Sequence, residues 1–339
     1  MASDTRVIVV GGGAAGFFAA IACAEKLGAN GTVVLLEATA HPLAKVRVSG
    51  GGRCNVTHAC FEPRELVKRY PRGGRELLGA FSRYQPRDTV EWFAARGVEL
   101  KTEADGRMFP ITDDSGTIVE CLARAAEQAG VKVITSLGVR TVERSASPGS
   151  SVSGSAFWLT LTDDANLRCE RLLIATGGNR SSAGLTIAQK LGHTIVDPVP
   201  SLFTFHIDDK RLEGLSGVSV PDATTSVPGT KLKEVGPLLI THWGLSGPAI
   251  LKLSAWGARV LAESNYEFPV LVNFAGAHTK ETLLAELSAV RGNNPRKQIS
   301  TWSPLDMPQR LWERLVMSSG IAATTGWAQV GNAALAGLV

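Results

Sequence analysis

The feature that most constrains this chain is a glycine-rich turn close to its first residue. A run of β-branched residues, Val7–Val10, leads into the sequence GGGAAG at residues 11–16, and a run of small residues follows up to Leu27. The next apolar run ends in an acidic residue, Glu37, about 20 residues after the turn, as the dinucleotide fingerprint requires. The sequence predicts a Rossmann-type βαβ unit here, and an ordinary βαβ unit with a tight turn is the alternative.

Each small residue of the turn has an expected physical role. Gly11 permits the tight turn, Gly13 lets the backbone approach a pyrophosphate, and Gly16 allows close packing of helix and strand. The first helical residues, Ala14 and Ala15, offer unpaired N–H groups and a partial positive charge to phosphates. We therefore expect these five residues to bind the cofactor.

Glu37 narrows the choice of dinucleotide. Its carboxylate can accept hydrogen bonds from both hydroxyls of an adenosine ribose. Its negative charge would repel a 2′-phosphate, since like charges at short range are unfavourable. FAD or NAD is therefore expected at this site rather than NADP.

A later part of the chain separates FAD from NAD. Two strand-like runs, which begin at Val139 and Phe157 and are joined by a Ser/Gly/Pro-rich turn, precede an apolar strand that ends in Ala175-Thr176-Gly177. An N-terminal fingerprint, an antiparallel meander and a strand ending in ATGG resemble the two-dinucleotide-binding-domain flavoproteins. The resemblance implies FAD, with Val139, Ala175, Thr176 and Gly177 among its contacts.

Residues 45–57 give the most specific local signal. Three consecutive glycines expose backbone N–H groups, and polar and basic side chains surround them. Such a loop suits an anionic ligand with many hydrogen-bonding groups, such as a pyrophosphate or the edge of an isoalloxazine ring. A polar surface loop would explain the glycines but not the density of donors. The cofactor-binding residues predicted here are Lys45, Ser49, Gly50, Gly51, Gly52, Arg53, Cys54 and Asn55.

The stretch Lys45–Thr57 resembles the SGGGRCN signature of the HI0933-like flavoproteins. Three later segments resemble further motifs of this family in the same order: Gly106–Pro110 its GRxFP, Gly192–Leu202 its GHT…PxPxL, and Gly236–Pro248 its G-x-L-L-F-T-H-x-G-L-S-G-P. The resemblance covers essentially the whole chain. It implies an FAD-dependent oxidoreductase that passes electrons through bound flavin, with an amine- or ketone-type small molecule as substrate and NAD(P)H as a candidate reductant.

The same resemblance implies the architecture. The fold class is α/β: a Rossmann-like two-dinucleotide-binding-domain flavoprotein fold with an inserted β domain and a small helical domain. We assign residues 1–190 to the FAD-binding domain, 191–275 to the β domain and 276–339 to the helical domain. Within the β domain only short strands are expected. Helices are expected near residues 62–79 and 86–96.

This sequence departs from the family pattern in three places. The region after ATGG is shortened to residues 179–184, and His58 stands where Asn is usual. Nothing before Val339 matches the family's C-terminal segment, which returns to the first domain and lines the flavin. The resemblance then implies exposed apolar surface near Val7–Val10 and the Ile174–Gly178 turn, and self-association. A truncated flavoprotein remnant with weak or no catalysis is an alternative.

Candidate catalytic side chains are few. Arg53 could lower the pKa of its neighbour Cys54, and His242 could serve as a general acid or base. A packing role for Cys54 and a structural role for His242 are the alternatives. Because the flavin carries the redox step, no catalytic side chain is strictly required.

Composition and charge limit the partners. The net charge is +4, and the five cysteines show no metal-ligand spacing, which favours a protein of the reducing cytoplasm without disulfides or a metal site. The uncharged stretch Leu315–Val339 is interpreted as buried helices rather than a membrane anchor. Residues 64–87 hold seven basic and two acidic side chains, so an RNA-associated flavoprotein is a further alternative, although a solvated helix face is favoured.

Overall fold

The computed structural model describes residues 5–145, 156–178 and 183–339. The chain forms two compact units, Met1–Val196 (unit 1) and Asp197–Val339 (unit 2), and each is described by itself. The turn predicted within residues 146–155 and most of the shortened segment at 179–184 lie outside the described residues.

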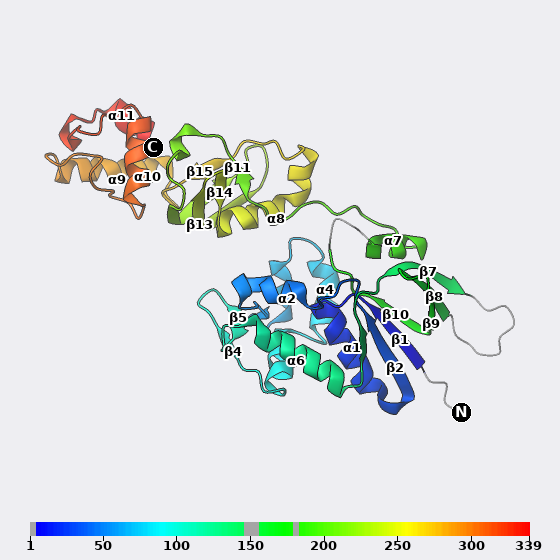
Figure 1. Ribbon diagram of the computed structural model, residues 1–339. Helices are drawn as coiled ribbons and strands as arrows, with labels where there is room; N and C mark the ends of the chain where they lie inside the picture. The colour runs from blue at the N-terminus through cyan, green and yellow to red at the C-terminus, as the bar shows by residue number, and fades with distance from the viewer. Residues whose placement is uncertain (1–4, 146–155, 179–182) are drawn as a thin grey trace. The chain divides into compact units, whose positions relative to one another are not determined.

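Unit 1 is built on a four-stranded parallel sheet in the order β10-β1-β2-β6, of which Figure 1 labels the first three strands. Strand β1 pairs with β2 on one side and with β10 on the other, so that Val10 lies opposite both Leu36 and Ile174. The strands are β1 (Thr5–Val10), β2 (Gly31–Leu36), β6 (Lys132–Ile134) and β10 (Arg171–Ile174). All four therefore end at the same edge, where ligands of open α/β sheets bind.

The two faces of this sheet are covered by different elements. Alternate β1 residues face opposite sides: Val9 packs with helices α1 (Ala14–Leu27) and α6 (Ser115–Gln128), whereas Ile8 packs with α7 (Ala183–Lys190) and an antiparallel meander. The meander comprises β7 (Val139–Ser145), β8 (Ala156–Leu161) and β9 (Asn166–Cys169). The expectation of exposed apolar surface at Val7–Val10 is wrong, because both faces are covered and these residues are at most 6% exposed.

Of the remaining elements of unit 1, η1 joins α1 to β2 and the others lie between β2 and α6. One continuous helix near residues 62–79 is not found, because Tyr70–Gly73 interrupts it with a proline and with Gly73 at a φ of +77°. The elements are η1 (Gly28–Asn30), α2 (Ala44–Val48), η2 (Ser49–Gly52), β3 (Thr57–His58), α3 (Pro63–Leu66), η3 (Val67–Arg69), α4 (Gly74–Phe81), α5 (Pro86–Ala94), β4 (Leu100–Thr102) and β5 (Arg107–Pro110). Strands β3, β5 and β4 form a small antiparallel sheet.

Unit 2 contains a five-stranded antiparallel sheet in the order β11-β14-β13-β12-β15. Its strands are β11 (Phe205–His206), β12 (Ser219–Ser226), β13 (Lys233–Thr241), β14 (Gly244–Ser246) and β15 (Leu271–Asn273), and η4 (Lys210–Leu212) precedes β12. A long helix, α8 (Pro248–Glu263), follows β14, where the sequence interpretation expected only strands. Its apolar residues Ile250, Leu253 and Leu261 recur at helical spacing and are buried.

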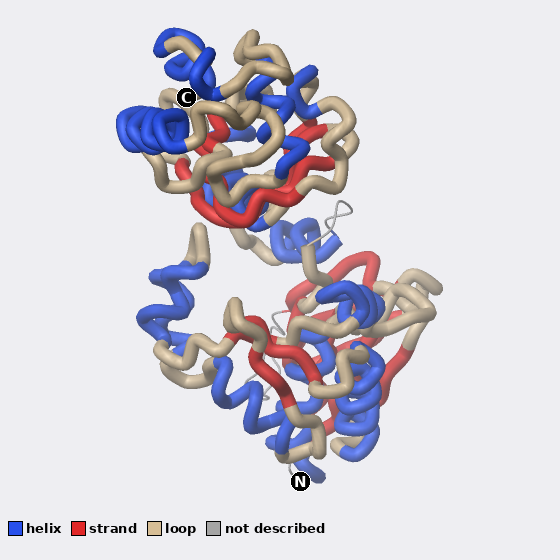
Figure 2. The backbone as a smooth tube through the Cα atoms, turned by 90° about the vertical axis from the view of Figure 1, so that its left-hand side faces the viewer, coloured by secondary structure: helices blue, strands red, loops and turns tan. Residues whose placement is uncertain are grey.

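The helices at the end of unit 2 lie beside the sheet (Figure 2), and their buried side chains share one hydrophobic core with it. They are α9 (Lys280–Asn293), α10 (Gln309–Ser318), η5 (Trp327–Gln329) and α11 (Asn332–Leu338). Trp312 and Trp327 are almost fully buried in this core, 6.3 Å apart between ring centres. In the described part of the chain, no helix combines the length and apolarity needed to cross a membrane.

Candidate cofactor site

The turn between β1 and α1 brings backbone segments so close that side chains would not fit. A Cβ atom on Gly11 would lie 2.4 Å from the Ala175 carbonyl oxygen, and one on Gly16 would lie 1.8 Å from the Gly11 carbonyl oxygen. Gly11 also has a φ of +111°, which favours glycine. At Gly13, by contrast, a Cβ would meet no atom within 4 Å, so open space lies beside the backbone.

The N-terminus of α1 opens onto this space. Its N-cap, Gly13, supplies no side-chain hydrogen bond, and the first turn carries no acidic residue. Ala14 and Ala15 are exposed there, so their N–H groups are accessible. An uncapped helix N-terminus attracts phosphate through these donors and through the helix dipole. The described residues therefore fit a dinucleotide pyrophosphate.

Glu37 lies at the end of β2 against the glycine turn. Its carboxylate accepts hydrogen bonds from the Gly12 N–H at 2.7 Å and from the Thr39 N–H and hydroxyl at 2.9 and 2.8 Å. Burial opposes ionisation, but these hydrogen bonds outweigh it and hold the pKa of Glu37 below its ordinary value of 4.5. The group is thus an anion at neutral pH, and a carboxylate has further lone pairs for a ribose.

Two more predicted segments meet the same edge of the sheet. The Ala175 N–H donates to the Val10 carbonyl at 2.7 Å, which places Ala175, Thr176 and Gly177 against the glycine turn. The Leu137 N–H donates to the Glu37 carbonyl at 2.9 Å, so Val139, at the start of β7, lies two residues along the chain from this contact with Glu37. Residues far apart in sequence therefore converge on one edge.

The loop from Lys45 to Asn55 is tied to this edge at two points. Lys45 Nζ donates to the Gly178 carbonyl at 3.1 Å, and the Leu43 N–H, just before α2, donates to the Gly12 carbonyl at 2.8 Å. Within the loop, Gly51 and Gly52 have φ values of +70° and +87° and face open space. Ser49, in contrast, donates its hydroxyl to the Val46 carbonyl, so that hydroxyl supports the loop itself.

Gly50 and Arg53 anchor the loop to strand β5. A Cβ on Gly50 would lie 2.8 Å from both the Asn55 nitrogen and the Phe109 ring. The Arg53 guanidinium lies 4.1 Å from the centre of that ring and pairs with Glu103 at 2.5 Å and Asp113 at 3.5 Å. Arg53 thus already has anionic partners in the chain, and a contact with a cofactor phosphate stays a prediction.

The pKa of the Cys54 thiol is shifted in the direction opposite to the one expected. Burial raises the pKa of its thiol, and the Ser49 hydrogen bond offsets this only in part. The expected lowering by Arg53 is wrong, because Arg53 is directed to Glu103 and Asp113. Cys54 is 5% exposed and has a φ of +62°, which fits a protonated, packed side chain.

His242 belongs to unit 2, in the turn between β13 and β14. Its ring lies 4.2 Å from the ring of Trp243, and both side chains are exposed. The predicted cofactor residues all belong to unit 1, whereas His242 belongs to unit 2. Its proposed acid–base role stays a prediction.

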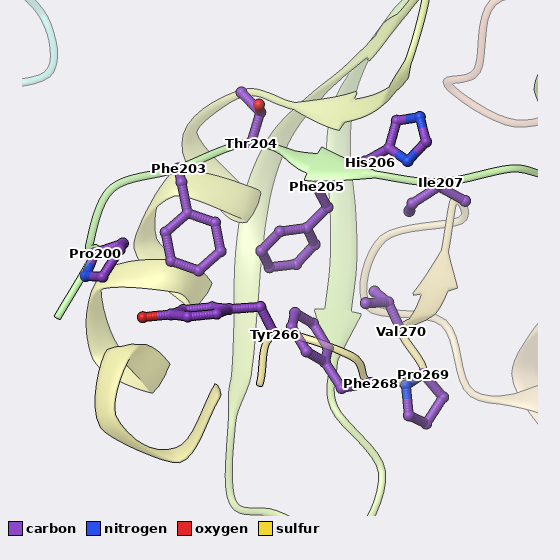
Figure 3. A pocket seen from close by; sticks show the side chains of 10 residues that line it. All are labelled: Pro200, Phe203, Thr204, Phe205, His206, Ile207, Tyr266, Phe268, Pro269 and Val270. Atoms are coloured by element: carbon purple, nitrogen blue, oxygen red, sulfur yellow. The ribbon is translucent and has the colours of Figure 1, made fainter. Parts of the chain in front are cut away.

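Unit 2 also contains an aromatic pocket that the sequence interpretation missed. Figure 3 shows the rings of Phe203, Phe205, Tyr266 and Phe268 gathered together, with His206 turned away from them. Neighbouring ring centres are 5.2–5.8 Å apart, and the cavity has a volume of about 560 Å³. Such a lining suits the flat apolar body of a small molecule. The residues come from two segments 60 positions apart, so no local motif could reveal them.

The parallel sheet, the open glycine turn and the ionised Glu37 define a class, the proteins with a Rossmann-type dinucleotide-binding domain. The family follows from sequence comparison. The model of the HI0933-like protein Rossmann domain matches residues 5–326, and the chain belongs to this HI0933-like family.

Curated relatives span most of the chain. The ribosomal RNA dihydrouridine synthase of Escherichia coli K12 is 30% identical over 318 residues, which are 91% of this chain and 72% of that protein. The 3-dehydro-bile acid delta(4,6)-reductase of Clostridium scindens is 27% identical over 277 residues, which are 79% of this chain and 64% of that protein. The two relatives carry names for different substrates.

Solved structures give a weaker likeness. Thermovibrio ammonificans THI4 is 16% identical with a TM-score of 0.38, over 58% of this chain and 66% of that one. The open conformation of a flavocytochrome c3 fumarate reductase is 19% identical with a TM-score of 0.40, over 65% of this chain and 47% of that one. Likeness at this level says nothing about the substrate.

Proposed function

We propose that this protein is an FAD-dependent reductase that saturates a carbon–carbon double bond conjugated to a carbonyl group. The observation that carries the proposal is the open dinucleotide cradle at Gly11–Gly16 and Glu37 in a chain with these two relatives. Dihydrouridine differs from uridine by saturation of the ring double bond next to a carbonyl. A 4,6-diene of a 3-oxo bile acid is likewise conjugated to its carbonyl. Both names therefore describe hydride addition to an activated alkene.

The chain's own residues would act mainly by binding and orientation. The N–H groups at the start of α1 would hold the pyrophosphate, and Glu37 would accept the ribose hydroxyls. The bound flavin supplies the hydride transfer, so no acidic or basic side chain of this chain is required for the electron transfer itself. We propose NADH or NADPH as the reductant: one molecule and one proton saturate one double bond and leave the oxidised nicotinamide.

A stepwise anaerobic titration tests this function. FAD-loaded protein should lose its visible flavin absorbance when NADH or NADPH is added, and regain it when a cyclic enone, a 4-ene-3-oxosteroid or uridine is added. The saturated ketone is the matched control and should leave the flavin reduced. Flavin that is reoxidised by dioxygen but by none of the alkenes, or that is reduced directly by an amine, would overturn the proposal.

An RNA substrate is a second candidate, favoured by the name of the E. coli relative and by the basic residues 64–87. The structure involves some of these cations in local contacts: Lys68 pairs with Glu65 at 2.7 Å, and the Arg87 guanidinium lies 4.7 Å from the Phe61 ring centre. A salt-dependent mobility shift with ribosomal RNA, and dihydrouridine formation in it, would favour this candidate over a small molecule.

A further inference from the structure

A cavity of unit 1 lies next to the predicted cofactor loop in the sequence. It has a volume of about 330 Å³, and its wall includes Asn55, His58, Tyr70, Tyr84 and Gln85. Asn55 belongs both to the loop that follows the three glycines and to this wall. The cavity therefore borders the predicted cofactor loop, and both lie within unit 1.

Aromatic rings form part of the wall. Tyr70 lies 5.6 Å from the ring centre of Phe81, and Tyr84 lies 5.5 Å from that of Phe18. Tyr70 and Tyr84 are each 40% exposed, so part of each ring is free to contact a ligand. Planar heterocycles stack on such rings regardless of their substituents.

The same wall holds two buried acceptors without donors. The Nδ1 atom of His58 and the Oε1 atom of Gln85 have no hydrogen-bond partner among the described residues. His58 Nε2 lies 3.1 Å from the Asp105 carbonyl oxygen, which can only accept, so in the neutral form of imidazole the proton sits on Nε2. Nδ1 is then an acceptor. Buried polar atoms are normally satisfied, so two such atoms in one cavity indicate a missing donor.

The chain segment that supplies much of the wall, including Leu66, Tyr70 and Tyr84, is basic in sequence, which favours an anion. Arg69 and Arg83 directly precede the two wall tyrosines, and residues 64–87 hold seven basic and two acidic side chains. A ligand that matches all three features has a planar ring, an N–H donor and a negatively charged group.

We propose that this cavity binds the amide-bearing ring of a nucleotide, with the ring against the tyrosines, a ring or carboxamide N–H donated to His58 Nδ1, and the phosphate near the basic segment. The inference rests on the proposed function, because two participants in that reaction carry this chemistry. One is the reduced nicotinamide of the reductant, and the other is the uracil of a nucleotide substrate.

Calorimetric titration of the full-length, FAD-loaded protein tests the proposal. Reduced nicotinamide mononucleotide and UMP are the two probes, since both lack the adenosine half whose ribose Glu37 would bind. Ribose 5-phosphate lacks the ring, and 3-methyluridine monophosphate lacks the ring N–H, so both serve as matched controls. We expect at least one probe to bind, and 3-methyluridine monophosphate to bind at least tenfold more weakly than UMP if UMP is that probe.

Two variants test whether the probe binds in this cavity. His58→Phe and Gln85→Leu each remove an acceptor and should weaken the bound probe about tenfold, whereas His193→Phe changes an exposed histidine elsewhere in unit 1 and should not. Two variants are used so that misfolding of one leaves the other informative. FAD content, read from visible absorbance, separates loss of the flavin from loss of the nucleotide.

The pattern of binding identifies the source of the ring. Tighter binding of reduced nicotinamide mononucleotide places the reductant here, and tighter binding of UMP places the substrate here. Ribose 5-phosphate binding as tightly as either probe, neither probe binding, or affinities unchanged in both variants would overturn the proposal.

Discussion

Four glycines of the turn between β1 and α1 are required for different reasons. Gly11, Gly12 and Gly16 face atoms of the chain itself, whereas Gly13 faces open space. The fingerprint already assigns Gly16 to packing and Gly13 to the approach of a ligand, and the structure adds that Gly12, a free position of the fingerprint, lies against the Glu37 side chain.

Alanine at Gly16 and Gly13 should therefore give different defects. Gly16→Ala places a methyl group 1.8 Å from the Gly11 carbonyl oxygen, so we expect a loss of about 1–3 kcal/mol in unfolding free energy together with weaker FAD binding. Gly13→Ala should leave the melting temperature nearly unchanged and weaken FAD at least tenfold. Thermal melts and flavin titrations of both variants measure this, and equal melting temperatures would contradict it.

Glu37→Ala should weaken FAD more than FMN, because only FAD carries the adenosine ribose. Lost hydrogen bonds to a charged group correspond to about 1.5–3 kcal/mol of binding free energy. Glu37 also accepts the Gly12 N–H, so Glu37→Gln, which keeps an acceptor oxygen, is the control that preserves the turn. Equal losses for the two flavins in a fluorescence titration would refute the ribose assignment.

The pH dependence follows from the lowered pKa of Glu37. Because the folded-state pKa lies below the unfolded value near 4.5, the stabilisation by this carboxylate is fully present above that pH and is lost as the pH falls through the folded-state pKa. We expect the acid loss of FAD to include a Glu37-dependent part confined to pH values below about 4.5. Comparison with Glu37→Gln across pH 3–7 isolates it, and a difference that begins above pH 5 would contradict it.

Some elements could be predicted from the sequence alone, and others could not. Strands β1 and β2 and helix α1 follow from a β-branched run, a glycine turn and a small-residue run, which are local signals. Helix α8 was missed because motif matching placed Gly236–Pro248 in a β domain, although the apolar spacing from Ile250 onward is helical. The cavity near His58 was missed for another reason: its residues come from separate turns and short helices, and only tertiary packing brings them together.

The two buried tryptophans of unit 2 allow a matched test of an element's packing. Trp312 Nε1 on α10 donates to the Ile299 carbonyl at 2.7 Å, whereas Trp327 Nε1 has no partner among the described residues. Trp312→Phe leaves a buried carbonyl unsatisfied and should cost about 1–3 kcal/mol more than Trp327→Phe. Urea denaturation of both variants measures the difference, and equal destabilisation would show that the hydrogen bond contributes nothing.

At the scale of the molecule, the division between Val196 and Asp197 differs in position from the predicted boundaries at 190 and 275. In unit 2 the strands and the final helices share one core, which the sequence could not show because the contacts join residues about 100 positions apart. The three-domain scheme remains a prediction about how the chain is organised.

Two compact units should respond differently to FAD. A ligand that binds only the folded form of unit 1 stabilises that unit, by about 2.7 kcal/mol at a free concentration 100 times its Kd. In calorimetry we expect added FAD to raise the melting temperature of one transition and leave the other unchanged. A single transition that shifts as a whole would show that the units unfold together.

The separation into units also distributes the chromophores unevenly. Five of the seven tryptophans lie in unit 2, whereas the glycine turn and Glu37 lie in unit 1. Indole emission would therefore report mainly on unit 2, and the visible absorption of bound FAD on unit 1. Because indole emission overlaps flavin absorption, energy transfer from tryptophan to flavin would measure how near the two units come in solution, and whether a substrate draws them together.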